Sequence, residues 1–190
     1  MIRTCANSIR AVHRRDYELA RTLQAAAREI SDGLTRDLAE HPDLFYAGYV
    51  QDAQKEYVEA VTTLSLISGA PLPSPGDIGV AAPAFLNGLA ETVGELRRFV
   101  LDKLRRGDLD GSEGLLQTMD DIYSLLVTID YPDALTGGLR RTTDATRGIL
   151  ERTRGDLTFA LRQQDLEAAL TRVERQIQAR LDEAGRDASA

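Results

Sequence analysis

The chain has 190 residues, a formal net charge of −7 and an apolar fraction of 43%, which fits one folded domain that is long enough to bury a core. It contains no apolar run of about 18 residues, so the sequence predicts no membrane-spanning helix and no membrane partner. The net negative charge argues against broad electrostatic adhesion to nucleic acid but leaves room for a local basic lining. A single cysteine, Cys5, allows no intramolecular disulfide and favours a cytoplasmic location.

Helix-forming residues dominate the chain, and no segment alternates for long between apolar and polar residues as a strand would. We predict helices over residues 9–38, 44–68, 84–106, 111–129, 139–162 and 166–184. Segment 69–83 contains four prolines and three glycines, which predicts a loop. The sequence therefore predicts an all-α antiparallel bundle of six to seven helices, with one domain over residues 1–184 and a polar tail over 185–190.

Two pairs of carboxylates stand out within the predicted helices. Glu56 and Glu59 are three residues apart, and Glu91 and Glu95 are four apart, so each pair shares one helix face. Four acids from two packed helices are suited to one hard cation such as Mg²⁺, and without the ion we expect their repulsion to raise at least one pKa. The alternative is a solvated face, because Glu91 and Glu95 lie nearly opposite the apolar stripe of their helix.

Several residues on the predicted helix 84–106 weaken this alternative. Phe85, Gly88 and Phe99 border the acidic side, which is unusual for a face that meets only water. Gly88 and Gly94 each cost a helix about 1 kcal/mol relative to alanine. We therefore expect another backbone or a ligand to approach this helix closely at the glycines.

Other candidate chemistry is sparse. His13 and His41 lie in no metal-binding motif and are interpreted as surface histidines, and Cys5 is interpreted as a bystander. Positive charge is grouped in two of the predicted helices, where it is suited either to phosphate contacts or to ion pairs within the helices. These basic residues are Arg97, Arg98, Lys103, Arg105 and Arg106 in one helix, and Arg140, Arg141, Arg147, Arg152, Arg154 and Arg162 in the other.

The acidic segments and their spacing resemble those of a known family. The matching segments are Gln54-Lys-Glu56-Tyr-Val-Glu59-Ala-Val61, Phe85-Leu-x-Gly88-Leu-Ala-Glu91-x-x-Gly94-Glu95-Leu-x-Arg98 and Gly107-Asp108. They resemble the translin superfamily, and most closely its translin-associated factor X (TRAX) branch, over most of the chain. The resemblance implies a seven-helix bundle that assembles into hollow octameric shells, which take single-stranded RNA or DNA inside.

The TRAX branch carries a magnesium-dependent endoribonuclease site of four acidic residues. The resemblance implies that Glu56, Glu59, Glu91 and Glu95 are the catalytic residues and the ligands of Mg²⁺ or Mn²⁺. Glu91 falls where that branch has an aspartate, whereas translin itself keeps only the acid that matches Glu95. Arg98, which belongs to the shared motif, is a candidate for nucleic-acid binding, with a structural ion pair as an equal alternative.

The residues and the resemblance leave three functions open. The leading hypothesis is a metal-dependent endoribonuclease that acts on single-stranded RNA inside a homo-oligomeric shell, by implication an octamer. The alternative is a shell that binds single-stranded RNA or DNA without catalysis, and the third is a helical assembly protein with neither activity. The aromatic residues Phe85, Phe99, Tyr123 and Tyr131 are expected to add to an apolar surface that is covered by oligomerisation.

Overall fold

The structure, a computed structural model, describes residues 1–187, with side chains described as far as Arg180. Within these residues the chain forms nine helices and no strand, which confirms the predicted all-α fold. Six helices are longer than a single turn: α1 (Ile2–His13), α2 (Tyr17–Asp37), α4 (Gly48–Ile67), α6 (Ala82–Leu104), α7 (Ser112–Val127) and α9 (Leu139–Asp187). Three are single turns: α3 (Pro42–Phe45), α5 (Pro75–Ile78) and α8 (Asp133–Thr136).

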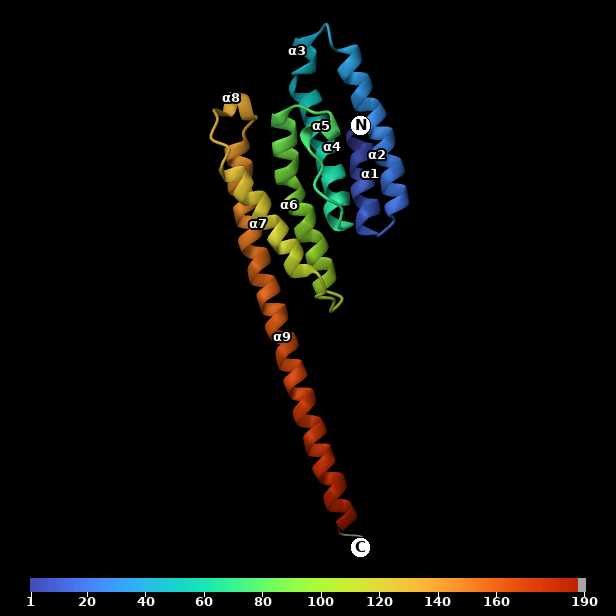
Figure 1. Ribbon diagram of the computed structural model, residues 1–190, viewed down its shortest axis with the longest axis vertical. Helices are drawn as coiled ribbons and strands as arrows, with labels where there is room; N and C mark the ends of the chain where they lie inside the picture. The colour runs from blue at the N-terminus through green and yellow to red at the C-terminus, as the bar shows by residue number, and fades with distance from the viewer. Residues whose placement is uncertain (188–190) are drawn as a thin grey trace.

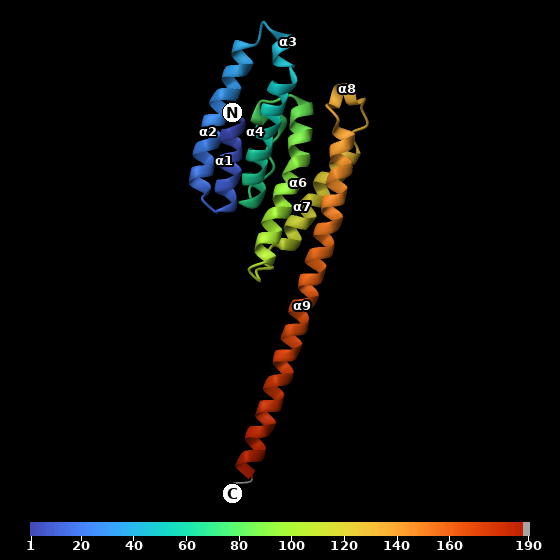
Figure 2. The ribbon, with the colours of Figure 1, turned by 180° about the vertical axis from the view of Figure 1, so that it is seen from behind.

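Helix α6 lies at the centre of the bundle. It packs against α4 on one side and against α7 and the first half of α9 on the other, while α1 and α2 cover α4 (Figure 1). The view from behind shows the same order and also shows α9 continuing well beyond the rest of the bundle (Figure 2). No helix among the described residues is long and apolar enough to cross a membrane.

The first predicted helix, residues 9–38, is wrong in its extent, because the structure divides it into α1 and α2. The chain reverses at Arg15, which adopts the left-handed conformation with φ of 62°. Asp16 then caps α2 by accepting a hydrogen bond of 3.2 Å from the backbone N–H of Leu19. As a result α1 folds back along α2, and Cys5 becomes fully buried in the core.

The last two predicted helices, residues 139–162 and 166–184, are a single helix, α9. No glycine or proline separates them, so nothing in the sequence stops the helix from continuing. The predicted tail, residues 185–190, overlaps the end of α9, and its last three residues lie outside the described part of the chain. The other predicted helices agree with α4, α6 and α7 to within a few residues, apart from the separate turn α3.

The main core surrounds α6, whose Leu89, Val93 and Leu96 are fully buried. Phe85 is also buried, at 5% exposure, which corrects its expected place on an apolar surface. Tyr131, by contrast, is exposed at 66%, in the turn between α7 and α8. Of these two aromatic residues, which were both expected on an apolar surface, only Tyr131 is exposed.

The close approach predicted at the two glycines of α6 is confirmed at Gly88 only. A Cβ atom on Gly88 would lie 2.6 Å from the carbonyl oxygen of Lys55 and 2.7 Å from the Cβ of Val58, both on α4. At Gly94 the added atom would have no neighbour within 4 Å. Gly88 therefore allows the backbones of α4 and α6 to approach closely.

These two glycines provide a matched test. Gly88→Ala should destabilise the protein by about 1–3 kcal/mol or more, because the backbone of Lys55 cannot rotate away as a side chain can. Gly94→Ala should stabilise it by about 0.5–1 kcal/mol through helix propensity alone. At roughly 2–4 °C per kcal/mol, thermal melts should move in opposite directions. Equal melting temperatures for the two variants would contradict the packing described at Gly88.

Candidate metal centre

The two predicted pairs of carboxylates do lie on facing helices. Glu56 and Glu59 project from α4, and Glu91 projects from α6 one turn after Gly88. One carboxylate oxygen from each of these three residues lies within 4.8 Å of the other two. The contact at Gly88 accounts for this proximity, because it brings the backbone next to Glu56 against the turn before Glu91.

Glu95 is not part of this three-residue group. Its Oε2 atom pairs with Nε2 of His13 on α1 and lies 3.7 Å from Nη1 of Arg98. Its negative charge nevertheless raises the pKa of Glu59, so it belongs to the same electrostatic neighbourhood. The structure thus separates the four predicted residues into a cluster of three and a fourth acid that is held by a histidine.

The pKa values of the clustered carboxylates reflect their burial and their crowding together. Burial, and then the negative charge of neighbouring acids, raise the pKa of Glu59 from its ordinary value of 4.5 to about 8. These neighbours, in order of effect, are Glu91, Glu95 and Glu56. Burial and the charge of Glu91 also raise the pKa of Glu56. The expectation that repulsion raises at least one pKa is confirmed.

Lys55 is a part of the site that sequence reasoning missed. Its Nζ atom lies 2.9 Å from Oε1 of Glu91 and 3.9 Å from Oδ1 of Asp52. Burial, the largest single cause, acts to lower the pKa of Lys55, but the hydrogen bond to Glu91 and the negative charges of Glu91, Asp52 and Glu56 together outweigh it, and the pKa is raised. The only hint in the sequence is that Lys55 stands next to Glu56. Sequence spacing cannot show that its side chain reaches across to α6.

The cluster fits a divalent cation such as Mg²⁺ or Mn²⁺. Oxygen ligands of Mg²⁺ lie about 2.1 Å from the ion, so opposite ligands are about 4.2 Å apart. The observed 4.8 Å limit needs only a small side-chain movement to reach that spacing. Carboxylate oxygens are the hard ligands that such ions prefer, and charge neutralisation would remove the repulsion that raises the pKa of Glu59.

His13 was predicted to be a surface residue, and this prediction is wrong. Its side chain is 5% exposed, and its ring lies 6.4 Å from that of Phe99. The second ring nitrogen, Nδ1, is buried without a hydrogen-bond partner in the described structure. No sequence motif points to the contact between His13 and Glu95, because the two residues are 82 positions apart in the chain.

Cys5 is buried, as a bystander would be, and burial is the main cause that raises the pKa of its thiol to about 11.

Two grooves meet at Glu91. One, of about 620 Å³, is lined by Tyr46, Lys55 and residues of α8, and the other, of about 470 Å³, is lined by Arg141 at the start of α9. Arg98 is 54% exposed near the opposite end of the acidic group. Cationic side chains therefore flank the cluster even though the protein has a net negative charge.

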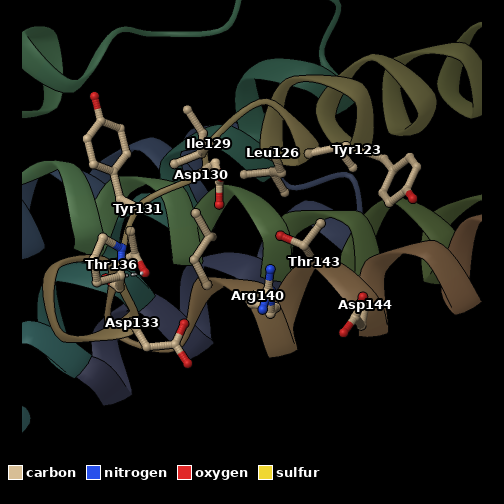
Figure 3. Close-up of a pocket in the computed structure, with 13 residues that line it drawn as sticks. Tyr123, Leu126, Ile129, Asp130, Tyr131, Asp133, Thr136, Arg140, Thr143 and Asp144 are labelled. Carbon is tan, nitrogen blue, oxygen red and sulfur yellow. Dashed lines mark hydrogen bonds between the residues drawn. The ribbon is translucent and has the colours of Figure 1, made fainter.

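A separate hollow of about 830 Å³ lies where α7, α8 and α9 meet (Figure 3). Arg140 and Thr143 point into it from α9, and Asp130 does so from the turn after α7 (Figure 3). The hollow contains none of the four predicted glutamates, and no sequence pattern singled it out.

The architecture is that of an all-helical bundle with a half-buried cluster of glutamates between two central helices. The chain is 32% identical to "Uncharacterized protein MJ0175" of Methanocaldococcus jannaschii over 175 residues, which cover 90% of this chain and 77% of that protein. No family model matches the chain.

Solved structures give the family. The crystal structure of AfC3PO is 36% identical, with a TM-score of 0.76 over 83% of this chain and 82% of that chain. The AfC3PO–duplex RNA complex is also 36% identical, with a TM-score of 0.78 over 84% and 82%. The fold of apo-NeC3PO is similar at 21% identity and a TM-score of 0.76, over 84% of this chain and 83% of that chain. The chain belongs to the translin superfamily.

Proposed function

We propose that the protein is a metal-dependent endoribonuclease of the TRAX type. The observation that carries this proposal is the cluster of Glu56, Glu59 and Glu91, whose carboxylate oxygens lie within 4.8 Å of one another at the close α4–α6 contact. Crowded carboxylates at this degree of burial cost free energy unless a cation or protons offset them. A structural role alone does not explain that cost.

The three clustered glutamates would hold Mg²⁺ or Mn²⁺, with Glu95 near the ion through water. When bound, the ion would polarise a phosphate oxygen and lower the pKa of the attacking water. Lys55 neutralises part of the charge on Glu91 and lies in the groove that leads to the cluster. The exposed guanidinium of Arg98 stands beside the site, where it is suited to contact a phosphate of the strand.

The proposed substrate is single-stranded RNA. The structure of AfC3PO, a 36% identical relative, has been solved in complex with duplex RNA, which supports RNA as the ligand class of this chain. The grooves beside Glu91 place Tyr46, Lys55 and Arg141 along a path to the cluster. An aromatic ring and two cationic groups are the side chains that single strands use for base stacking and phosphate contacts.

The direct test is incubation of a labelled single-stranded RNA with the purified protein and Mg²⁺, Mn²⁺ or EDTA. We expect internal cleavage with either ion and intact RNA in EDTA, with binding in all three conditions. Binding without cleavage would favour the second candidate, a translin-like shell that binds single-stranded RNA or DNA without catalysis. The contacts of Lys55 with Glu91 and of His13 with Glu95 support that candidate, since they offset two acids without a metal.

We further propose that the protein is a homo-oligomer, with an octamer as the specific expectation. The projecting half of α9 carries apolar side chains at spacings of three, four and seven residues, which place them on one helix face. They are all more than half exposed: Phe159, Leu166, Leu170, Val173 and Ile177. Such a stripe, away from the rest of the bundle, is suited to pack against another copy of the chain (Figure 1).

Light scattering tests this assembly. Wild-type protein should have a mass several times that of the 20.8-kDa chain, and about 166 kDa if it is an octamer. Leu170→Lys with Ile177→Lys should lower the mass, because two charges would have to be buried in the contact. Ala168→Lys, on the opposite face of α9, is the matched control and should leave the mass unchanged. A wild-type mass near 21 kDa would remove the proposal.

A further inference from the structure

The contact between α1 and α6 assigns different roles to the four glutamates. Oε2 of Glu95 accepts a hydrogen bond from Nε2 of His13 and also faces Arg98. Among the described residues, no hydrogen bond reaches the other oxygen, Oε1. One carboxylate oxygen of Glu95 is thus hydrogen-bonded to His13, and the other has no hydrogen-bond partner among the described residues. The three clustered glutamates have no histidine partner in the described structure.

The side chain of His13 is held in place by the packing of the surrounding core. It lies in the last turn of α1, its side chain is 5% exposed, and the ring of Phe99 packs beside it. α1 itself is held against α4, because its Ala11 and Val12 are fully buried with Leu64. The direction of the Nε2–H donor, and with it the orientation of Glu95, is therefore fixed by core packing.

We infer that His13 is a positioning residue that keeps Glu95 out of direct coordination to the metal and aims its free oxygen at the attacking water. This inference rests on the proposed nuclease function. In the hydrolysis, the oxygen of water bonds to phosphorus while its proton passes to Oε1 of Glu95. The bond from phosphorus to one ester oxygen breaks, and that oxygen leaves with the electron pair and takes up a proton from solvent. A carboxylate in this position serves as the general base.

A comparison of metal affinities tests the assignment without using activity. Mn²⁺ binding to the full-length protein is followed by electron paramagnetic resonance of the free ion. Glu59→Gln should weaken binding at least tenfold, because it removes a ligand oxygen, whereas Glu95→Gln should weaken it less than threefold. If Glu95→Gln weakens Mn²⁺ binding as much as Glu59→Gln, Glu95 is a direct ligand and the inference is overturned. Absence of Mn²⁺ binding by the wild type would overturn it as well.

The role of His13 is tested by kinetics on single-stranded RNA. His13→Leu, which keeps an apolar body but cannot donate a hydrogen bond, should lower kcat at least tenfold while KM and Mn²⁺ affinity stay within threefold. His13→Gln, whose side-chain amide can donate, should recover most of the lost kcat. His41→Leu is the matched control, since the His41 side chain is exposed just before α3 and makes no described hydrogen bond or ion pair with the four glutamates.

The outcomes separate this inference from the proposed function. Parallel losses of kcat and Mn²⁺ affinity in His13→Leu, or no recovery in His13→Gln, would mean that His13 only supports the fold and would overturn its positioning role. Wild-type protein that binds Mn²⁺ but cleaves no RNA would refute the nuclease proposal and with it the proton transfer to Glu95. The comparison of Glu59→Gln with Glu95→Gln would still decide whether Glu95 lies outside the coordination shell.

Discussion

Glu59→Gln is expected to reduce metal-dependent cleavage of single-stranded RNA to the level seen in EDTA. The substitution keeps nearly the same shape but removes a charged oxygen from the cluster of three carboxylates. Glu95→Gln should lower the rate by at least about 100-fold, which is the usual contribution of a general base. Initial rates at saturating Mn²⁺, measured with a labelled RNA, would show both effects.

RNA binding should behave differently from cleavage in the same variants. Filter binding in EDTA should give affinities close to wild type, because cationic side chains rather than glutamates contact phosphate. Glu29→Gln, on an exposed face of α2, is the control and should change neither property. Cleavage by Glu59→Gln at the wild-type rate would show that the glutamate cluster is not the catalytic centre.

The second large effect concerns stability in the absence of metal. Because Glu59 has its pKa raised from 4.5 to about 8 in the folded protein, the folded state binds a proton between these values that the unfolded state has lost. The free energy of unfolding should therefore be highest below about pH 4.5 with respect to this group, and should fall as pH rises through 8. The raised pKa of Glu56 acts in the same direction. The effect of Glu59 alone is on the order of a few kcal/mol.

Thermal melts between pH 6 and pH 9 would measure this dependence. In EDTA the melting temperature of the wild type should fall by several degrees across the range. Millimolar Mg²⁺ or Mn²⁺ should restore it, and more strongly at the alkaline end, where the carboxylates are ionised and ion binding stabilises the folded state. Glu59→Gln should melt higher than wild type at pH 9 in EDTA and should respond little to the ions. A wild-type melting temperature that rises with pH in EDTA would contradict the raised pKa.

The helical fold and the two acidic helix faces follow from local patterns in the amino-acid sequence. Helical periodicity, prolines and glycine pairs are such patterns, so they locate α4, α6 and α7 to within a few residues. The spacing within each glutamate pair is also local, which is why each pair can be assigned to a helix face from the sequence. The cost of glycine in a helix points to Gly88 for the same reason.

How those residues are used depends on contacts between segments that are distant in the chain. The reversal at Arg15 needs a left-handed residue and a cap, and it places His13 against Glu95 from 82 positions away. The reach of Lys55 to Glu91, and the clear space at Gly94, likewise depend on how α4 and α6 pack. Periodicity defines a face of each helix, but burial and pKa depend on what the neighbouring helices place against that face, and those contacts are non-local.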